Sequence, residues 1–174
     1  ITGTGCFMHC RRRFVNAIIV RDLKTLKPEQ IKNLPEYKSQ VLIDAIYNTD
    51  TPLKKLPAKE RLARRNTEVR PNVDAFFDYL HSLDLNDPSY SDRLRDAVSY
   101  SLNQETRLRM FLEDASIPAD NGNCERKLKS YITGRNNWLF IYSLTGAEVM
   151  AIIFTLVETA KANQVHPYYY LCIF

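Results

Sequence analysis

The chain has 174 residues, of which 45% are hydrophobic and 25% are charged. This composition allows one packed domain, or one domain with a helical appendage, and excludes a disordered chain. The chain contains 5 glycines, which argues against a loop-rich all-β fold, and its net charge of +4 is too small to establish a nucleic-acid partner by itself.

The first predicted elements are a short strand and two helices. Residues 3–8 are predicted to form the strand. Phe14, Ala17 and Ile18, which follow the arginines at positions 11–13, recur at helical spacing and predict the first helix. Leu34 and Pro35 indicate the start of a second helix, with apolar side chains recurring on one face of residues 36–48. Residues 48–52 are predicted to form a turn.

The middle of the chain is predicted to be helical. Residues 57–83 are too long for one regular helix, because Pro71 removes a backbone donor and clashes with the preceding turn. We therefore expect two helices or a kinked one. A break at residues 86–89 precedes a long helix over residues 89–114, which ends before Pro118.

The C-terminal part continues the helical pattern. Asn121 or Asn123 is expected to cap a helix that ends at Gly134. Residues 138–142 are the second β-like run, and a buried extended segment explains them equally well. Residues 146–163 are predicted to form a helix that is apolar on most sides, and its apolar run is too short to span a membrane.

The cysteines indicate a reducing compartment. The four cysteines have no spacing typical of a disulfide framework, which favours a cytoplasmic protein. Cys6 and His9 have a spacing seen in zinc sites, but no second paired motif completes one, so buried thiols are the stronger interpretation. The chain begins at Ile1 without a signal peptide or an initiator methionine, and we expect a fragment or a processed product.

Basic residues gather at residues 11–13, 54–70 and 126–135. Such runs are more often solvated helix faces than binding sites, although three in one chain favour a polyanionic partner. Glu125 falls in the first turn of its predicted helix, where the helix dipole favours a carboxylate, and Lys129 follows on the same face. Taken alone, these two residues form an ordinary surface ion pair.

Residues 120–140 have the sequence DNGNCERKLKSYITGRNNWLF. This segment resembles the Asp-Asn-Asn-x-x-Glu, the Arg four positions later and the Gly-Arg-Lys-Asn-Trp-Leu-Phe of the insertion sequence 66 family of bacterial transposases, and two further motifs are similar to that family. Residues 5–14, GCFMHCRRRF, are similar to its Gly-Cys-Trp-Ala-His-x-Arg-Arg-x-Phe. Residues 156–163, LVETAKAN, resemble its closing Ile-Glu-Thr-Ala-Lys-x-Asn. The chain departs from the family pattern at Gly122, Ser130 and Asn136.

The resemblance implies a DDE transposase with a ribonuclease-H-like core. In such enzymes two aspartates and one glutamate hold two Mg²⁺ ions for attack on a phosphodiester. Glu125 is then the catalytic residue and third metal ligand of this chain. DNA contact is expected from basic or polar residues in the matching motifs, with packing or a solvated surface as an equal alternative for each: Arg11, Arg12, Arg126, Lys129, Arg135 and Asn137.

The expected fold is mainly α and forms the C-terminal part of a ribonuclease-H-like α/β core with one or two short strands. Residues 1–20 are assigned to the last core strand and the start of the next helix. Residues 21–118 form an all-helical insertion, and residues 119–174 form the C-terminal part of the core with the Glu125 helix. The expected partners are transposon-end DNA and, in the complete enzyme, further copies of the same chain; no membrane is expected.

The two catalytic aspartates are expected outside this chain. In the family they precede the motif at residues 5–14, and here no aspartate precedes Asp22. We therefore expect that the chain alone is inactive and does not hold Mg²⁺. Asp120 is near Glu125 in sequence, but its family context is a turn, which argues against its replacing a missing ligand. The alternatives are a non-catalytic helical module that binds DNA or protein, as a decayed or domesticated transposase remnant, and a helical protein with no DNA role.

Overall fold

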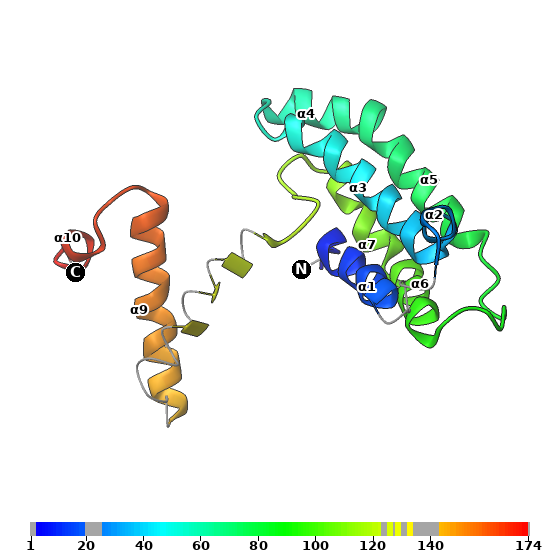
Figure 1. The fold of residues 1–174 in the computed structure, drawn as a ribbon. Helices are drawn as coiled ribbons and strands as arrows, with labels where there is room; N and C mark the ends of the chain where they lie inside the picture. Colours follow the sequence, from blue (N-terminus) through cyan, green and yellow to red (C-terminus); the bar gives the residue numbers. More distant parts are fainter. Residues whose placement is uncertain are drawn as a thin grey trace. The chain divides into compact units, whose positions relative to one another are not determined.

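The computed structural model describes residues 3–19, 26–122, 125–126, 128–129, 132–133 and 143–173. The chain divides into two compact units, Ile1–Asn121 and Gly122–Phe174, which are described separately (Figure 1). The described residues are mainly helical and contain no strand. The mainly α class predicted from the sequence is therefore correct.

The first unit is a bundle of helices around one core. Its longest helix, α3, packs against both α1 and α5, and α1 also packs against α6. In Figure 1 the α4–α5 run follows α3 along its length. The helical elements of this unit are α1 (Phe7–Ile19), α2 (Pro28–Asn33), α3 (Pro35–Leu53), α4 (Ala58–Arg64), the π-helical segment η2 (Arg65–Val69), α5 (Arg70–His81), α6 (Asp92–Asn103), α7 (Glu105–Arg109) and the 3₁₀ turn η3 (Met110–Leu112).

Aromatic side chains form the centre of this core. Phe76 on α5 meets Phe7 and Phe14 of α1 edge to face, with ring centroids 6.1 Å apart in both pairs. The ring centroids of Phe77 and Phe76 are 5.0 Å apart, and those of Phe111 and Phe7 are 5.8 Å apart. All of these rings are fully or almost fully buried, and such pairs add to the stabilisation that burial alone provides. They join α1 to the helices of the predicted insertion in a single core.

The strand predicted over residues 3–8 is wrong. Residues 3–6 have no regular secondary structure, and α1 begins at Phe7. The Gly5 N–H donates to the Arg107 carbonyl oxygen at 2.9 Å, and the Phe7 N–H donates to that of Ala119 at 3.1 Å. These backbone groups are satisfied by a helix end and a loop, so no neighbouring strand is needed. The second β-like run, residues 138–142, lies outside the described residues.

Two prolines act differently at the ends of the predicted helices. The start at Pro35 is confirmed, with Leu34 at the N-cap and Pro35 at the first helical position. The turn predicted over residues 48–52 is wrong, because α3 continues to Leu53 with Pro52 inside its last turn. Burial of Asp50 and Leu53 holds this last turn against the core.

The interruption expected near Pro71 is confirmed. The helical run changes from α4 to the wider turns of η2 before α5 starts, and Pro71 is the second residue of α5. A π-helical turn contains one more residue than an α-helical turn, which lets the chain continue as a helix although Pro71 has no N–H to donate. The single helix predicted over residues 89–114 is wrong, since Gln104, at φ −101° and ψ 4°, separates α6 from α7.

The second unit contains a helical segment around Glu125, followed by α9 (Leu144–Ala162) and α10 (Pro167–Leu171). The helix predicted over residues 146–163 is confirmed as α9, which starts two residues earlier. The Ser143 hydroxyl caps it by accepting a bond from the Gly146 N–H at 3.0 Å. Within the described part of the chain, α9 and the other helices are too short or too polar to cross a membrane.

Candidate metal ligand and DNA-contact residues

Glu125 lies in a helical segment of the second unit. Helical conformation begins at Gly122, which places Asn121, one of the two caps predicted from the sequence, at the N-cap position; the alternative, Asn123, lies outside the described residues. The capping bond of Asn121 would reach residues 123–124, which lie outside the described residues. The Glu125 side chain is half-buried, and Lys129, one turn later, is exposed. A carboxylate near the start of a helix is favoured by the helix dipole, which keeps it available as an oxygen ligand.

The residues that lead to this helix are held by the first unit. The Cys6 thiol donates to Asn121 Oδ1 at 2.9 Å. Asp120 Oδ2 lies 4.0 Å from Lys54 Nζ, and the Asp120 side chain is 15% exposed. Together with the bond between the Phe7 N–H and the Ala119 carbonyl, these contacts fix residues 119–121 on the bundle. The Lys54 contact gives Asp120 a role in this attachment.

A buried arginine stabilises the preceding loop. Arg65 Nε lies 2.7 Å from Asp50 Oδ1, and both side chains are almost completely buried. Its Nη1 donates to the carbonyl oxygens of Phe111 and Ile117, both at 2.9 Å. Arg65 belongs to the basic run at residues 54–70, so this member of the run is a structural residue and not a DNA contact.

Arg11 and Arg12 have different environments although they are adjacent. Arg11 Nε donates to Asp44 Oδ1 at 2.6 Å and its Nη2 donates to Asp44 Oδ2 at 3.2 Å, a two-bond contact that joins α1 to α3. The hydrogen bond to Asp44 raises the pKa of Arg11 above its ordinary value. Arg12 is exposed and has no ion pair or hydrogen bond with the residues that the structure describes. Of the two, Arg12 is the one available to a phosphate.

Arg12 lines a hollow on the first unit. This hollow has a volume of about 480 Å³ and is lined by Met8, Arg11, Arg12, Val15 and Tyr47. Burial raises the pKa of Tyr47 well above its ordinary value, so its hydroxyl stays protonated. Because Asp44 balances Arg11, the positive charge at this hollow comes mainly from Arg12.

The remaining predicted DNA contacts lie in the second unit. Arg126 and Lys129 are exposed on the same helical segment as Glu125. Arg135 and Asn137 lie outside the described residues. The DNA-binding role of all four stays a prediction.

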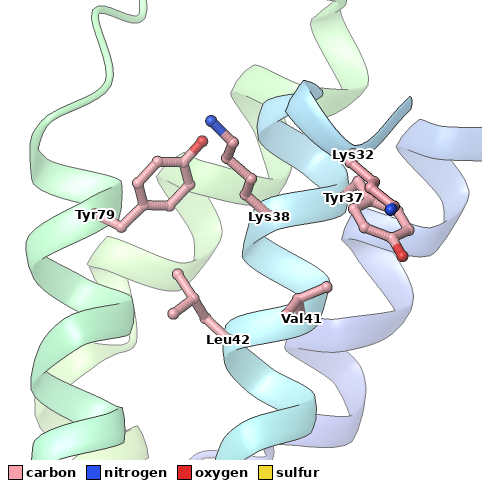
Figure 2. Close-up of a pocket in the computed structure, with 6 residues that line it drawn as sticks. All are labelled: Lys32, Tyr37, Lys38, Val41, Leu42 and Tyr79. Atoms are coloured by element: carbon pink, nitrogen blue, oxygen red, sulfur yellow. The ribbon is translucent and has the colours of Figure 1, made fainter. Parts of the chain in front are cut away.

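A second hollow lies on another part of the bundle, and the sequence interpretation missed it. It has a volume of about 490 Å³ and takes residues from α2, α3 and α5 (Figure 2), namely Lys32, Tyr37, Lys38, Val41, Leu42 and Tyr79. Burial raises the pKa of Tyr79 to about 12, so its hydroxyl is protonated at neutral pH. Five of the lining residues lie within residues 32–42, whereas Tyr79 comes from a distant helix that the sequence alone does not bring to them.

The family model described as Transposase IS66 family matches residues 1–149. The chain belongs to this family. Two relatives from Sinorhizobium fredii (strain NBRC 101917 / NGR234), the uncharacterized proteins y4hP and y4jD, are 27% and 29% identical to it. The matches cover 96% and 95% of this chain, which spans only 30% of the length of each relative. No solved structure matches the chain.

The first motif of this IS66-family chain has a packing explanation. A Cβ atom on Gly5 would lie 2.8 Å from the backbone nitrogen of Leu108, so only glycine fits this approach. Cys10 is fully buried against the Ser101 hydroxyl at 2.9 Å, and burial raises its pKa to about 12. Cys6 is also buried.

The described residues do not assemble a metal site. Within them, no three histidine, cysteine, aspartate or glutamate side chains gather closely enough to hold an ion. Glu125 supplies one carboxylate, whereas two divalent ions need several.

Proposed function

We propose that this chain is the C-terminal part of a DDE transposase with a ribonuclease-H-like core, and that Glu125 is one of its metal ligands. Membership of the IS66 transposase family is the observation that carries this proposal. The position of Glu125 supports it, because a half-buried carboxylate one turn into a helix is exposed enough to meet a cation and packed enough to be oriented.

The cation that suits such a carboxylate is Mg²⁺, which in this enzyme class activates the attacking oxygen and stabilises the leaving oxygen. The described residues do not fit a complete site, so no catalytic step is assigned to them. The other ligands are proposed to be aspartates of a longer protein, because the chain spans only 30% of the length of its relatives. We infer that residues 1–174 alone neither cleave nor join DNA.

The proposed partner is transposon-end DNA. Arg12 is the proposed contact from the first motif, since its guanidinium is exposed and unpaired among the described residues. Arg126 and Lys129 are exposed beside Glu125 and are proposed to contact the phosphates near the reacting bond. Arg11 contributes through Asp44 and α3, and its loss affects mainly stability. Self-association is proposed for the complete enzyme, as the family resemblance implies.

A non-catalytic helical module is the second candidate. The observation that favours it is the self-contained core of the first unit, which buries its aromatic cluster without any strand among the described residues. Such a module would bind DNA or protein through basic surfaces, and Glu125 would be a surface residue of its helix.

A cleavage assay distinguishes these candidates. The longer protein and the 174-residue chain are each incubated with a labelled transposon-end duplex and Mg²⁺. The proposal predicts strand cleavage by the longer protein and none by the chain, while both bind DNA with an affinity that falls as salt is added. Cleavage by the chain alone contradicts the inferred position of the aspartates. Binding without cleavage by either protein supports the non-catalytic module.

A further inference from the structure

The hollow formed by α2, α3 and α5 combines an apolar floor with polar groups at its rim. Val41 and Leu42 on α3 form part of the floor, and Val41 is 48% exposed. Figure 2 shows Lys38 and Tyr79 projecting into the space between α3 and α5, with Leu42 below them. Lys32 and Tyr37 contribute from α2 and from the start of α3. A volume of about 490 Å³ lies within the range of small-ligand sites.

Two exposed lysines carry positive charge at the rim. Lys32 and Lys38 are exposed, and neither has an ion pair with the residues that the structure describes. Arg70 and Arg109 of the same unit, in contrast, pair with carboxylates at 2.8 Å or closer. Besides burial, the charge of Glu36 helps to raise the pKa of Tyr79, but Glu36 itself is completely buried. Lys32 and Lys38, in contrast, are exposed to solvent.

The two tyrosines give the hollow aromatic faces and hydrogen-bonding groups. Both rings are half-buried, and neither hydroxyl has a hydrogen bond within the described part of the chain. Aromatic faces beside lysines suit a ligand with a flat, weakly polar part and an anionic part. A nucleotide has both, because its base stacks on an aromatic ring and its phosphate attracts an amine. An extended acidic peptide would use the charges but not the aromatic faces.

We propose that this hollow binds an unpaired nucleotide of the DNA substrate, with the base over Val41 and Leu42 beside the tyrosine rings and the phosphates at Lys32 and Lys38. This inference rests on the proposed DNA partner and adds a second contact region, separate from the Arg12 hollow. It assigns to the helical bundle the recognition of a single-stranded or unpaired position, in addition to contact with duplex phosphates.

The test compares two oligonucleotides of identical duplex sequence, one blunt and one with a short single-stranded overhang carrying 2-aminopurine. The affinity of the 174-residue chain for each is measured by titration, and stacking is followed by the loss of 2-aminopurine fluorescence. We expect preference for the overhang by about tenfold, as stacking of one base predicts, and fluorescence quenching on binding.

Two variants and two controls assign the effect to the hollow. Tyr37→Leu, which keeps an apolar side chain, and Lys38→Gln, which removes one exposed charge, should each lower the overhang preference several-fold and reduce quenching. Tyr37→Phe should retain the preference. Lys59→Gln removes an exposed charge from α4 outside the hollow and should change affinity for both oligonucleotides equally. Circular dichroism and thermal unfolding verify that the variants are folded.

The outcomes separate this inference from the proposed function. If the chain binds both oligonucleotides equally, and Arg12→Gln weakens both, the nucleotide hollow is wrong and the DNA partner stands. If an acidic peptide binds the chain in a way that Tyr37→Leu abolishes, and the overhang oligonucleotide does not displace that peptide, the hollow binds a peptide and the nucleotide proposal is wrong. If no form of the chain binds DNA, both proposals fail.

Discussion

The two units differ in the burial of their charged and apolar side chains. The first unit buries the Arg65–Asp50 ion pair almost completely inside an aromatic core. In the second unit, the Lys161–Glu158 pair of α9 lies at the surface, and apolar residues of the same helix are exposed, with Ile152 at 61%. The first unit therefore has a closed aromatic core, whereas α9 packs against α10 and leaves several apolar side chains exposed.

A related contrast divides the basic residues of the first unit into those that pair with acids and those that do not. In the first unit, many basic residues of the predicted clusters pair with acids, as Arg64 does with Glu68 and Arg70 with Glu113. The exposed cations without such pairs among the described residues, Arg12 among them, are few enough to test one by one. We therefore propose the exposed, unpaired cations as the DNA-contact candidates to test first.

The largest expected effect comes from breaking the buried pair. Arg65→Ala leaves Asp50 buried without its partner and should lower the free energy of unfolding by about 3–5 kcal/mol. Lys161→Ala breaks an exposed pair in α9 and should change it by less than about 1 kcal/mol. Urea denaturation of the chain measures both. The double variant Asp50→Leu, Arg65→Met should recover much of the loss, and equal effects of the two single variants would contradict the comparison.

The next largest loss of stability is expected from a substitution at Gly5, which lies close to α7. A Cβ at Gly5 meets backbone and side-chain atoms of Leu108 within 2.9 Å, so Gly5→Ala should destabilise the first unit by about 1–3 kcal/mol. Gly3→Ala is the matched control, since nothing lies within 4 Å of a Cβ there. Thermal unfolding of the two variants gives the difference. Similar melting temperatures would mean that residues 3–6 are not held against α7.

The buried thiol of Cys10 should make the first unit sensitive to alkali. Burial raises its pKa from 9.0 to about 12, so below pH 9 the thiol is neutral in both states and its contribution is complete. As the pH rises from 9 towards 12 the unfolded chain loses the proton first, and stability falls by at most about 1.4 kcal/mol per pH unit for this group. Denaturation at a series of pH values measures the slope. Cys10→Ser should flatten it, although Tyr79 contributes in the same direction.

The smallest effects distinguish two neighbouring arginines. Arg11→Gln removes the two-bond contact with Asp44 and should lower stability by up to about 1 kcal/mol. Arg12→Gln should leave stability unchanged within about 0.5 kcal/mol but weaken DNA binding and reduce its salt dependence by about one phosphate contact. Denaturation and salt-dependent titration measure the two quantities. The reverse pattern would assign DNA contact to Arg11.

Local signals in the sequence predicted part of this fold. Pro35 and Pro71 were located correctly because proline acts on its own turn, whatever packs around it. Pro52 was misinterpreted because burial of Asp50 and Leu53 decides the end of α3, and their partners lie elsewhere in the chain. The strand at residues 3–8 failed for the same reason, since its backbone groups bond to Arg107 and Ala119.

The residues of the candidate site were predicted mainly from the family motifs, since periodicity and charge alone indicated only a surface ion pair at Glu125. The position of Glu125 in a helix followed from short-range signals, which left Asn121 and Asn123 as alternative caps. The sequence could not separate Arg11 from Arg12, which point to different sides of α1 because successive residues turn by about 100°. Nor could it show that Arg65 is buried or that Tyr79 joins Tyr37, since both depend on helices far apart in the chain.

The role of Glu125 is the central claim, and one substitution tests it directly. In the longer protein, Glu125→Gln keeps the size of the side chain and removes its charge, while Glu148→Gln does the same at an exposed position of α9. Mg²⁺-dependent cleavage of a transposon-end duplex should fall more than about 100-fold for Glu125→Gln, with DNA binding unchanged, and stay normal for Glu148→Gln. Full cleavage by Glu125→Gln, or loss of DNA binding together with cleavage, would contradict a metal-ligand role.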